Sequence, residues 1–274
     1  MNFLPALLIS FSVFAGISGN DDRQESRAPG VPALLRDLSF SVPAIVERKN
    51  LIPSGNNFLP QGYPMEKMGF CPDVKFSGQQ YLARCSSSLI GEDLILTAGH
   101  CIDDDVKKWC QDYVVVFDYA VGVGDKIIQK KNIFNCKEVI YKKFEGAFDE
   151  DLALIRLEKK VTGRDIISIS KTPVAVNDPL TMIGYPLGIA QKIVDDGSLT
   201  RIGPDKYSFR HNLDSFSSNS GGPLFNVNGE QVGVLVRGTG PNFSDVPGKS
   251  CYDWGVDRDT DYTEANSLLH LPLP

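Results

Sequence analysis

The sequence is poor in histidine and in positive charge. Only three histidines occur, His100, His211 and His270, so a reaction that needs an imidazole base has few candidates. Lysine and arginine together number 28 against 34 aspartates and glutamates, which gives a formal net charge of −6 at pH 7. No basic patch with interleaved aromatic residues is present. These deficits argue against nucleic acid as a partner.

Long apolar runs are also scarce. After the first residues, no run is long enough for a transmembrane helix. Residues 1–19 have an apolar core and end in small residues, as secretory signal peptides do, although no lysine or arginine lies near the start. We expect a signal peptide cleaved within a few residues of Gly19, and a mature protein that is extracellular or periplasmic and leaves the membrane. The alternative, a membrane anchor or a buried helix, is disfavoured because charges begin at Asp21.

The remaining chain has no internal repeat and no low-complexity tract. At 274 residues, 42% of them hydrophobic, it can bury a sizeable core. We expect a polar, turn-rich N-terminal arm or propeptide over 20–62, a main domain over 63–256 and a C-terminal tail over 257–274. Short strand-like runs separated by turn signals are found at 81–90, 94–98, 113–119, 133–141, 152–157, 180–184, 193–194, 206–210, 222–227 and 231–236.

Three short segments carry residues that can act together. They read Thr-Ala-Gly-His-Cys at 97–101, Asp-Glu-Asp-Leu-Ala-Leu-Ile at 149–155 and Ser-Asn-Ser-Gly-Gly-Pro at 218–223. Serine becomes a useful nucleophile only when a histidine takes its proton and a carboxylate orients that histidine. Each segment alone has a structural explanation, such as a polar turn or an edge carboxylate. All three in this order rarely arise by chance.

The order of histidine, aspartate and serine, each in this surrounding sequence, resembles the chymotrypsin-fold serine peptidases. The resemblance implies an all-β fold of two six-stranded antiparallel β-barrels, with the active site in the cleft between them. It implies that Ser220 is the nucleophile, His100 the base and Asp151 the orienting carboxylate. Asp149 competes for the last role, but the apolar run starts just after Asp151, as the family pattern requires. The backbone N–H groups of Ser218 and Ser220 would form the oxyanion hole.

Two positions depart from the family pattern. Ser218 stands where glycine is usual, and a serine with positive φ would cost roughly 1–3 kcal/mol. Asn219 replaces the aspartate that, in animal digestive members, pairs with the N-terminal amine freed by zymogen cleavage. Activation by that ion pair is therefore not expected. Asparagine at this place is similar to the bacterial secreted members, including the glutamyl endopeptidase branch, and the resemblance covers roughly 70–253.

The residues that would line the primary specificity pocket give a mixed picture. Asp214 lies where trypsin-like members have a carboxylate that favours arginine or lysine before the scissile bond. The bacterial branch also carries aspartate followed by serine or threonine there, so Asp214 and Ser215 do not decide the preference. Leu235 stands in place of the pocket histidine of glutamyl members. Arg237, followed by Gly238, would bind acidic substrate side chains, neutralise Asp214 or point to solvent.

The six cysteines fit an oxidising compartment, where disulfides persist. The family resemblance implies one bridge that restrains the histidine loop, which typically stabilises by roughly 2–4 kcal/mol. Fixing that bridge leaves three ways to pair the other four cysteines. The pairs that we favour are Cys85 with Cys101, Cys110 with Cys136 and Cys71 with Cys251.

The acidic clusters at 103–105 and 257–261 lack the spacing of a calcium loop, so we predict no metal and no cofactor. The sequence as a whole predicts a secreted serine endopeptidase that acts on proteins or peptides. The alternative is a catalytically impaired homologue that serves as an extracellular binding module, which only Ser218 favours. An esterase of unrelated fold would place its serine before the histidine. The sequence gives no indication of oligomeric state.

Overall fold

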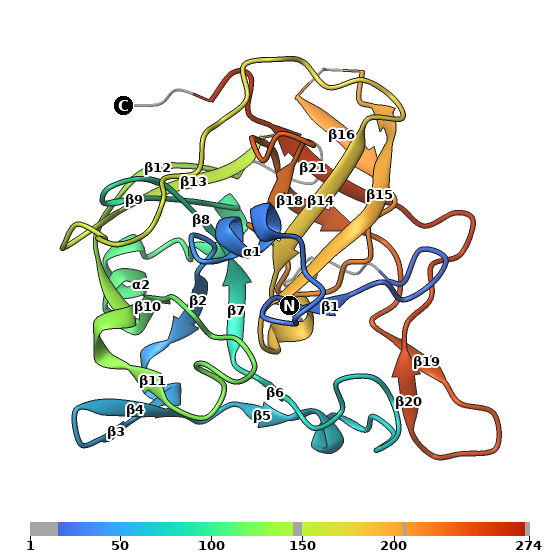
Figure 1. The fold of residues 1–274 in the computed structure, drawn as a ribbon, viewed down its shortest axis with the longest axis horizontal. Helices are drawn as coiled ribbons and strands as arrows, with labels where there is room; N and C mark the ends of the chain where they lie inside the picture. The colour runs from blue at the N-terminus through green and yellow to red at the C-terminus, as the bar shows by residue number, and fades with distance from the viewer. Residues whose placement is uncertain (1–15, 145–149, 205–206, 272–274) are drawn as a thin grey trace, which may run out of the picture.

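Two β-barrels lie side by side in the computed structural model, which describes residues 16–144, 150–204 and 207–271 (Figure 1). The first large sheet contains β2 (Ala44–Glu47), β7 (Ala83–Ser86), β8 (Ser88–Gly91), β9 (Leu94–Thr97), β10 (Tyr113–Val116), β12 (Ile133–Phe144) and β13 (Asp151–Leu157). The second contains β1 (Gln24–Glu25), β14 (Pro179–Gly184), β15 (Lys192–Ile202), β16 (Ser208–His211), β17 (Pro223–Phe225), β18 (Gln231–Gly238) and β21 (Thr263–Ser267). This is the all-β, two-barrel fold that the sequence predicted.

Smaller elements surround these sheets. The short strands are β3 (Leu51–Ser54), β4 (Asn57–Pro60), β5 (Tyr63–Pro64), β6 (Gln80–Tyr81), β11 (Ile128–Gln129), β19 (Phe243–Asp245) and β20 (Tyr252–Trp254). The helices are α1 (Ala33–Ser39) and α2 (Val106–Asp112), with 3₁₀ turns η1 (Arg48–Asn50), η2 (Met65–Met68), η3 (Gly99–Cys101), η4 (Lys130–Asn132) and η5 (Pro186–Gly188). No helix in the described ranges is long and apolar enough to cross a membrane.

The first barrel closes because β7 and β8, the strands at the two ends of its sheet, follow one another in the chain. The order is β7-β2-β10-β12-β13-β9-β8, and only Ser87 separates β7 from β8. All pairings are antiparallel, with β13 between β12 and β9. All residues of β9 and all but Arg156 of β13 are buried, and Ile95, Leu152 and Leu154 lie in one core cluster with Trp109. This barrel carries the histidine and aspartate segments.

The second barrel has the order β1-β15-β14-β17-β18-β21-β16, and β15 also pairs with β16, which brings the ends of the sheet together. Its core includes Leu180, Val194 and Leu224. Val234 and Val236 of β18 belong instead to the core cluster of the first barrel. The barrels are therefore joined by buried apolar contacts, and the serine segment lies at this junction.

Residues outside the predicted main domain contribute to both sheets. β2 lies between β7 and β10 in the first, and β21 lies between β18 and β16 in the second. Residues before β1 pack on the second barrel, where the Arg23 side chain is fully buried against Trp254 and Phe216. The peptidase-like fold therefore uses chain on both sides of 63–256.

The cysteines form three disulfides, and each pair is the one that the sequence analysis favoured. Cys85 is bonded to Cys101, Cys110 to Cys136 and Cys71 to Cys251. The last bridge joins residues 180 positions apart in the sequence.

Candidate active site

The histidine lies in η3, a single tight turn that follows strand β9. All four residues of β9 are buried, so the strand fixes where the turn begins. Gly99 is required at this point, because a Cβ there would lie 2.1 Å from the Lys143 carbonyl oxygen of β12. The disulfide between Cys101 and Cys85 ties the end of the turn to β7. Together these contacts restrain the backbone that carries His100.

The His100 ring and the Asp151 carboxylate form a close pair. Nδ1 of His100 lies 2.7 Å from Oδ2 of Asp151, and the His100 backbone N–H donates to Oδ1 at 2.9 Å. Asp151 is 3% exposed at its side chain, whereas the His100 ring is 20% exposed. A buried carboxylate that binds Nδ1–H leaves Nε2 of the neutral ring as a proton acceptor.

The backbone of Asp151 is held in place by the second barrel. Asp151 begins β13, and its backbone N–H donates to the Asn266 side-chain oxygen of β21 at 2.6 Å. The competing carboxylate of the sequence analysis, Asp149, lies outside the described residues.

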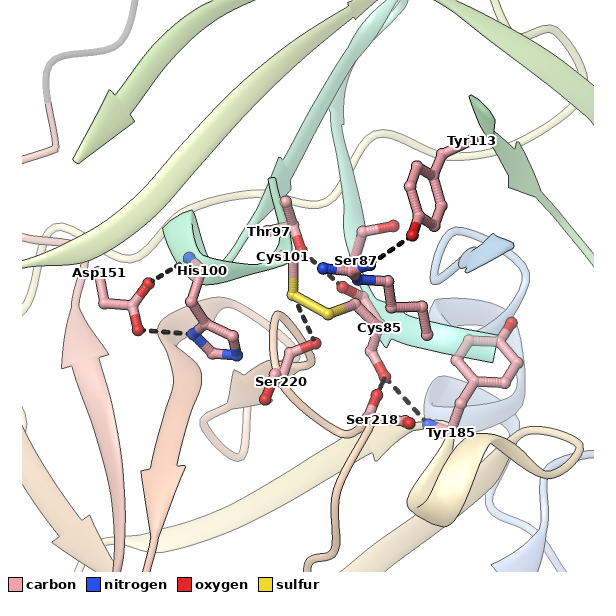
Figure 2. The surroundings of a disulfide bond; sticks show 12 residues. Cys85, Ser87, Thr97, His100, Cys101, Tyr113, Asp151, Tyr185, Ser218 and Ser220 are labelled. Carbon is pink, nitrogen blue, oxygen red and sulfur yellow. Dashed lines mark hydrogen bonds and ion pairs between the residues drawn. A yellow bond between two sulfur atoms is a disulfide. The ribbon is translucent and has the colours of Figure 1, made fainter. Parts of the chain in front are cut away.

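Ser220 lies in a tight loop that precedes β17 (Figure 2). Its carbonyl oxygen accepts a hydrogen bond from the Ser86 N–H at 2.8 Å and lies 3.8 Å from Sγ of Cys101. Gly221 follows with φ +84°, and a Cβ there would lie 2.1 Å from both the Ser86 carbonyl and the Thr97 hydroxyl. A side chain after the serine is thus excluded, and the loop can approach the histidine turn closely.

Asp151, the His100 ring and Ser220 follow one another in Figure 2, in the arrangement that the sequence predicted for a triad. Within the described part of the chain, no hydrogen bond joins the Ser220 hydroxyl to the His100 ring. Such contacts are often long before substrate is bound. The structure therefore brings the three predicted residues together, with the carboxylate–histidine contact already made.

The loop before Ser220 has a backbone suited to an oxyanion hole. Ser218 has φ +71°, the left-handed conformation expected of the glycine that it replaces. The Ser217 carbonyl accepts from the Leu187 N–H at 2.6 Å, and in a trans peptide the Ser218 N–H must point the opposite way. Neither the Ser218 nor the Ser220 N–H donates to another backbone group among the described residues. Both donors are thus free to bind a ligand.

Ser86 is a supporting residue that the sequence analysis did not single out as functional. Its hydroxyl donates to the Ser218 carbonyl at 2.9 Å and accepts from the Tyr185 N–H at 3.0 Å. Its backbone N–H holds Ser220, as described above. Ser86 follows Cys85 directly, so its place beside the disulfide was the available signal.

Asn219 is buried, and its side chain has no hydrogen bond with a charged group among the described residues. Its side-chain nitrogen contacts Sδ of Met182 at 3.9 Å, and its side-chain oxygen has no hydrogen-bond partner in the described ranges.

Asp214, which the sequence analysis assigned to the specificity pocket, is buried, and its oxygens are already bound. They accept from the Ser18 N–H at 2.8 Å and the Asp22 N–H at 3.2 Å. Burial is the main cause that raises the pKa of Asp214 to about 8, with the nearby Asp22 carboxylate adding to it. Its neighbour Ser215 has its hydroxyl 3.2 Å from that of Thr263.

Arg237 pairs with Glu264 on the adjacent strand at 3.0 Å, and both side chains are nearly buried. The same carboxylate lies 3.6 Å from Arg210. Gly238 ends β18 and is paired with Thr263 of β21. This ion pair with Glu264 is none of the three roles that the sequence analysis considered for Arg237.

One group of potential metal ligands lies close together in the described ranges, namely His100 with Cys85 and Cys101. Both sulfurs belong to a disulfide, so neither can act as a thiolate ligand.

Comparisons with known proteins agree with this geometry. A family model described as "Trypsin-like peptidase domain" matches residues 85–234, more than half of the 274 residues. A snake venom serine protease, HS114 of Bothrops jararaca, is 25% identical over 206 residues, which are 64% of this chain and 75% of that protein. Protease Do-like 2, chloroplastic, of Arabidopsis thaliana is 25% identical over 179 residues, 61% of this chain, and the chain spans about a quarter (26%) of that relative.

Two solved structures have a similar fold. A Glu endopeptidase in complex with MPD superposes with a TM-score of 0.53 at 17% identity and covers 92% of this chain and 93% of its own. The VesB protease of Vibrio cholerae gives 0.50 at 16% identity, over 84% of this chain and 61% of its own. At these identities the likeness concerns the fold.

Proposed function

Since this chain belongs to the trypsin-like peptidase family, we propose that it is a secreted serine endopeptidase in which Ser220, His100 and Asp151 form the catalytic triad. The observation that carries the proposal is the 2.7 Å contact between a buried aspartate and His100, set beside a serine in a glycine-bounded loop. Three disulfides are in keeping with an oxidising compartment.

In the acylation step, Ser220 Oγ attacks the carbonyl carbon of the scissile peptide bond. His100 Nε2 takes the hydroxyl proton, and Asp151 stabilises the imidazolium through Nδ1–H. The oxyanion forms near the free N–H groups of Ser218 and Ser220, each of which is typically worth 10²–10³ in kcat.

Collapse of the tetrahedral species breaks the C–N bond, and the leaving amine takes the proton held by His100. A water molecule then hydrolyses the acyl-enzyme. His100 accepts a proton from the water, the hydroxide adds to the acyl carbon, and Ser220 leaves with the proton returned by His100.

The alternative of an impaired homologue loses its main support. Ser218 already has the positive φ that the glycine-like conformation demands, so the strain does not prevent the loop from forming. Its carbonyl is held by Ser86, which offsets part of the cost of that conformation.

We further propose that the primary pocket does not select by a fixed charge. Asp214 is bound by two backbone donors, and its raised pKa keeps much of it uncharged at neutral pH. The Arg237 guanidinium is held in an ion pair with Glu264, which Arg210 also approaches. Selection then depends on pocket shape and on the Ser215 and Thr263 hydroxyls.

A digest of a denatured mixed-protein substrate tests both proposals. Every new terminus is read by mass spectrometry, with Ser220→Ala alongside. We expect cleavage by the parent protein only, with uncharged residues before the scissile bond. Cleavage confined to arginine and lysine, or to glutamate, would contradict the pocket proposal, and cleavage by Ser220→Ala would contradict the triad.

A further inference from the structure

The first residues that the structure describes are built into the fold beside the specificity pocket. Ile17 forms a parallel bridge with Val256, in which the Ile17 N–H donates to the Gly255 carbonyl at 2.8 Å and the Asp257 N–H donates to the Ile17 carbonyl at 2.9 Å. The Ile17 side chain is buried in a cluster with Phe70 and Trp254. A segment held in this way is part of the folded unit.

This segment also contacts Asp214 and Ser215, the residues that we propose to line the primary pocket. The Gly16 carbonyl accepts from the Ser215 N–H at 3.2 Å, and the Ser18 N–H donates to Asp214 at 2.8 Å. The positions of Asp214 and Ser215 therefore depend on where residues 16–18 lie.

Beside Gly16 lies a carboxylate without a cation. Oδ1 of Asp257 is buried and has no hydrogen-bond partner within the described ranges. Burial raises the pKa of Asp257 to about 6, the Gly16 N–H offsets this only in part, and the charge that adds to the rise is another carboxylate, Asp261. The neighbouring Arg258 is bound to Asp261 instead.

The carboxylate is wedged between two glycines. A Cβ on Gly16 would lie 2.7 Å from Asp257 Oδ1, and one on Gly240 would lie 1.9 Å from it. The Gly240 Cβ position is also 3.0 Å from the Gly16 nitrogen. The nitrogen of residue 16 and the unpartnered oxygen thus face the same small space, which no side chain can enter.

The sequence just before Gly16 is suited to removal of a leader. Val13-Phe14-Ala15 places a small residue directly before Gly16 and an aliphatic residue two positions earlier, close to the pattern at which signal peptides are cut. A cut at this bond would leave the whole of the bridged segment on the mature chain.

We propose that hydrolysis of the Ala15–Gly16 peptide bond creates the mature N-terminus, and that the α-ammonium of Gly16 is the missing ionic partner of Asp257. A leader-cleaving peptidase adds water across the bond, so that Ala15 leaves with a carboxylate and Gly16 gains the ammonium. The ion pair then anchors 16–18, and through it Asp214 and Ser215. The proposal concerns maturation and stands without the peptidase activity of the chain itself.

The test compares two N-termini in a Ser220→Ala background, so that stability is measured without turnover. One form begins at Gly16 and the other at Ala15, each released from a removable carrier. At pH 7, we expect Asp257→Asn to lower Tm by roughly 2–4 °C in the Gly16 form, and to leave the Ala15 form unchanged or more stable. The matched control is Asp259→Asn, at an exposed aspartate two residues further on, which should change neither form.

The pH profiles of the two forms should also differ. In the Ala15 form, folding raises the pKa of Asp257 to about 6, so its Tm should fall as the pH rises through that value. The Tm of the Gly16 form should stay constant through pH 6 and fall only above the ordinary α-amino pKa of about 8. Asp257→Asn should remove both trends.

The intact mass of the protein secreted by an expression host supplies the second measurement. A first residue of Gly16 supports the proposal, and a mature chain that begins at Asn20 or later overturns it. Equal effects of Asp257→Asn in the two forms would also overturn it, because the carboxylate would then have no link to the N-terminal charge.

Discussion

At the scale of single residues, the site is set by a few unusual environments. Asp151 is buried beside a histidine that is 20% exposed, Ser218 has a left-handed backbone, and the buried Asp214 accepts from two backbone N–H groups. In the proposed mechanism, the first makes a proton acceptor, the second aims a backbone donor, and the third removes a charge from the pocket floor.

Replacing Asp214 by asparagine tests the last point. Folding raises the pKa of Asp214 to about 8, so the free energy of unfolding contributed by this group is lost as the pH rises through 8. We expect Asp214→Asn to flatten that loss and to keep the parent's cleavage preference. Chemical denaturation at pH 5 and 9, with peptide cleavage assays, measures both, and a large selective fall in cleavage after arginine or lysine would contradict the account.

Ser218→Gly should be stabilising. Glycine adopts φ +71° without steric cost, although its greater freedom in the unfolded chain offsets part of the gain. We expect a rise of about 1 kcal/mol in the free energy of unfolding, with kcat kept or raised. A fall in stability on thermal or urea unfolding would show that Ser218 is not strained.

These residues illustrate what the sequence could predict. The segments around His100, Asp151 and Ser220 are recognisable because packing also restricts their neighbouring residues. Gly99 and Gly221, for example, have no room for a Cβ. Short-range patterns of this kind are readable. The hydrogen bonds from Ser18 and Asp22 to Asp214 could not be predicted, because those residues lie far away in the sequence and contribute only backbone N–H groups.

At the scale of elements, the strand ends of one barrel fix the loop of the other. Ser86, at the end of β7, holds the Ser218 carbonyl through its hydroxyl and the Ser220 carbonyl through its N–H. Asn266 of β21 in turn receives the N–H of Asp151. The serine segment and the aspartate segment are therefore each oriented by a strand of the opposite barrel.

Ser86→Ala should loosen the oxyanion loop without removing a catalytic group. The Ser218 carbonyl and the Tyr185 N–H both lose a buried partner, which is costly. We expect kcat to fall roughly tenfold with little change in KM, less than the 10²–10³ for loss of a direct oxyanion donor. Steady-state kinetics on a peptide ester measure the effect.

Ser88→Ala is the matched control for this prediction. Ser88 lies two residues further along, and its buried hydroxyl has no partner within the described ranges. It should leave kcat unchanged. Equal effects of the two substitutions would mean that Ser86 acts only by packing.

The element that the sequence analysis missed, β21, shows where strand patterns fail. Its sequence Thr-Glu-Ala-Asn-Ser is polar and was assigned to the tail, yet all five residues are buried. Their polar groups are satisfied by partners that are distant in the chain: Glu264 by Arg237, Thr263 by Ser215 and Asn266 by Asp151. Apolar periodicity cannot reveal a strand that is buried in this way.

At the scale of the whole molecule, the proposed active site depends on the docking of two barrels. The first supplies His100 and Asp151 and the second supplies Ser220, while Val234 and Val236 extend the first core into the second barrel. The resemblance to a known family was enough to predict this architecture and the bridge from Cys85 to Cys101, and the places of the other four cysteines in the chain favoured the remaining two pairs. The run at 41–47 is strand-like, and β2 forms there. The packing of 16–27 depends on tertiary contacts that no local motif records.

The most direct test of the central claim is covalent labelling with a fluorophosphonate, which reacts with a serine only when a neighbouring base activates it. We predict one adduct, with loss of fluoride, located by mass spectrometry on Ser220, and labelling slowed by several orders of magnitude in His100→Ala. The exposed His270 provides the control, and His270→Ala should label at the parent rate. An adduct on another residue, no adduct at all, or equal labelling of His100→Ala would contradict the proposed triad.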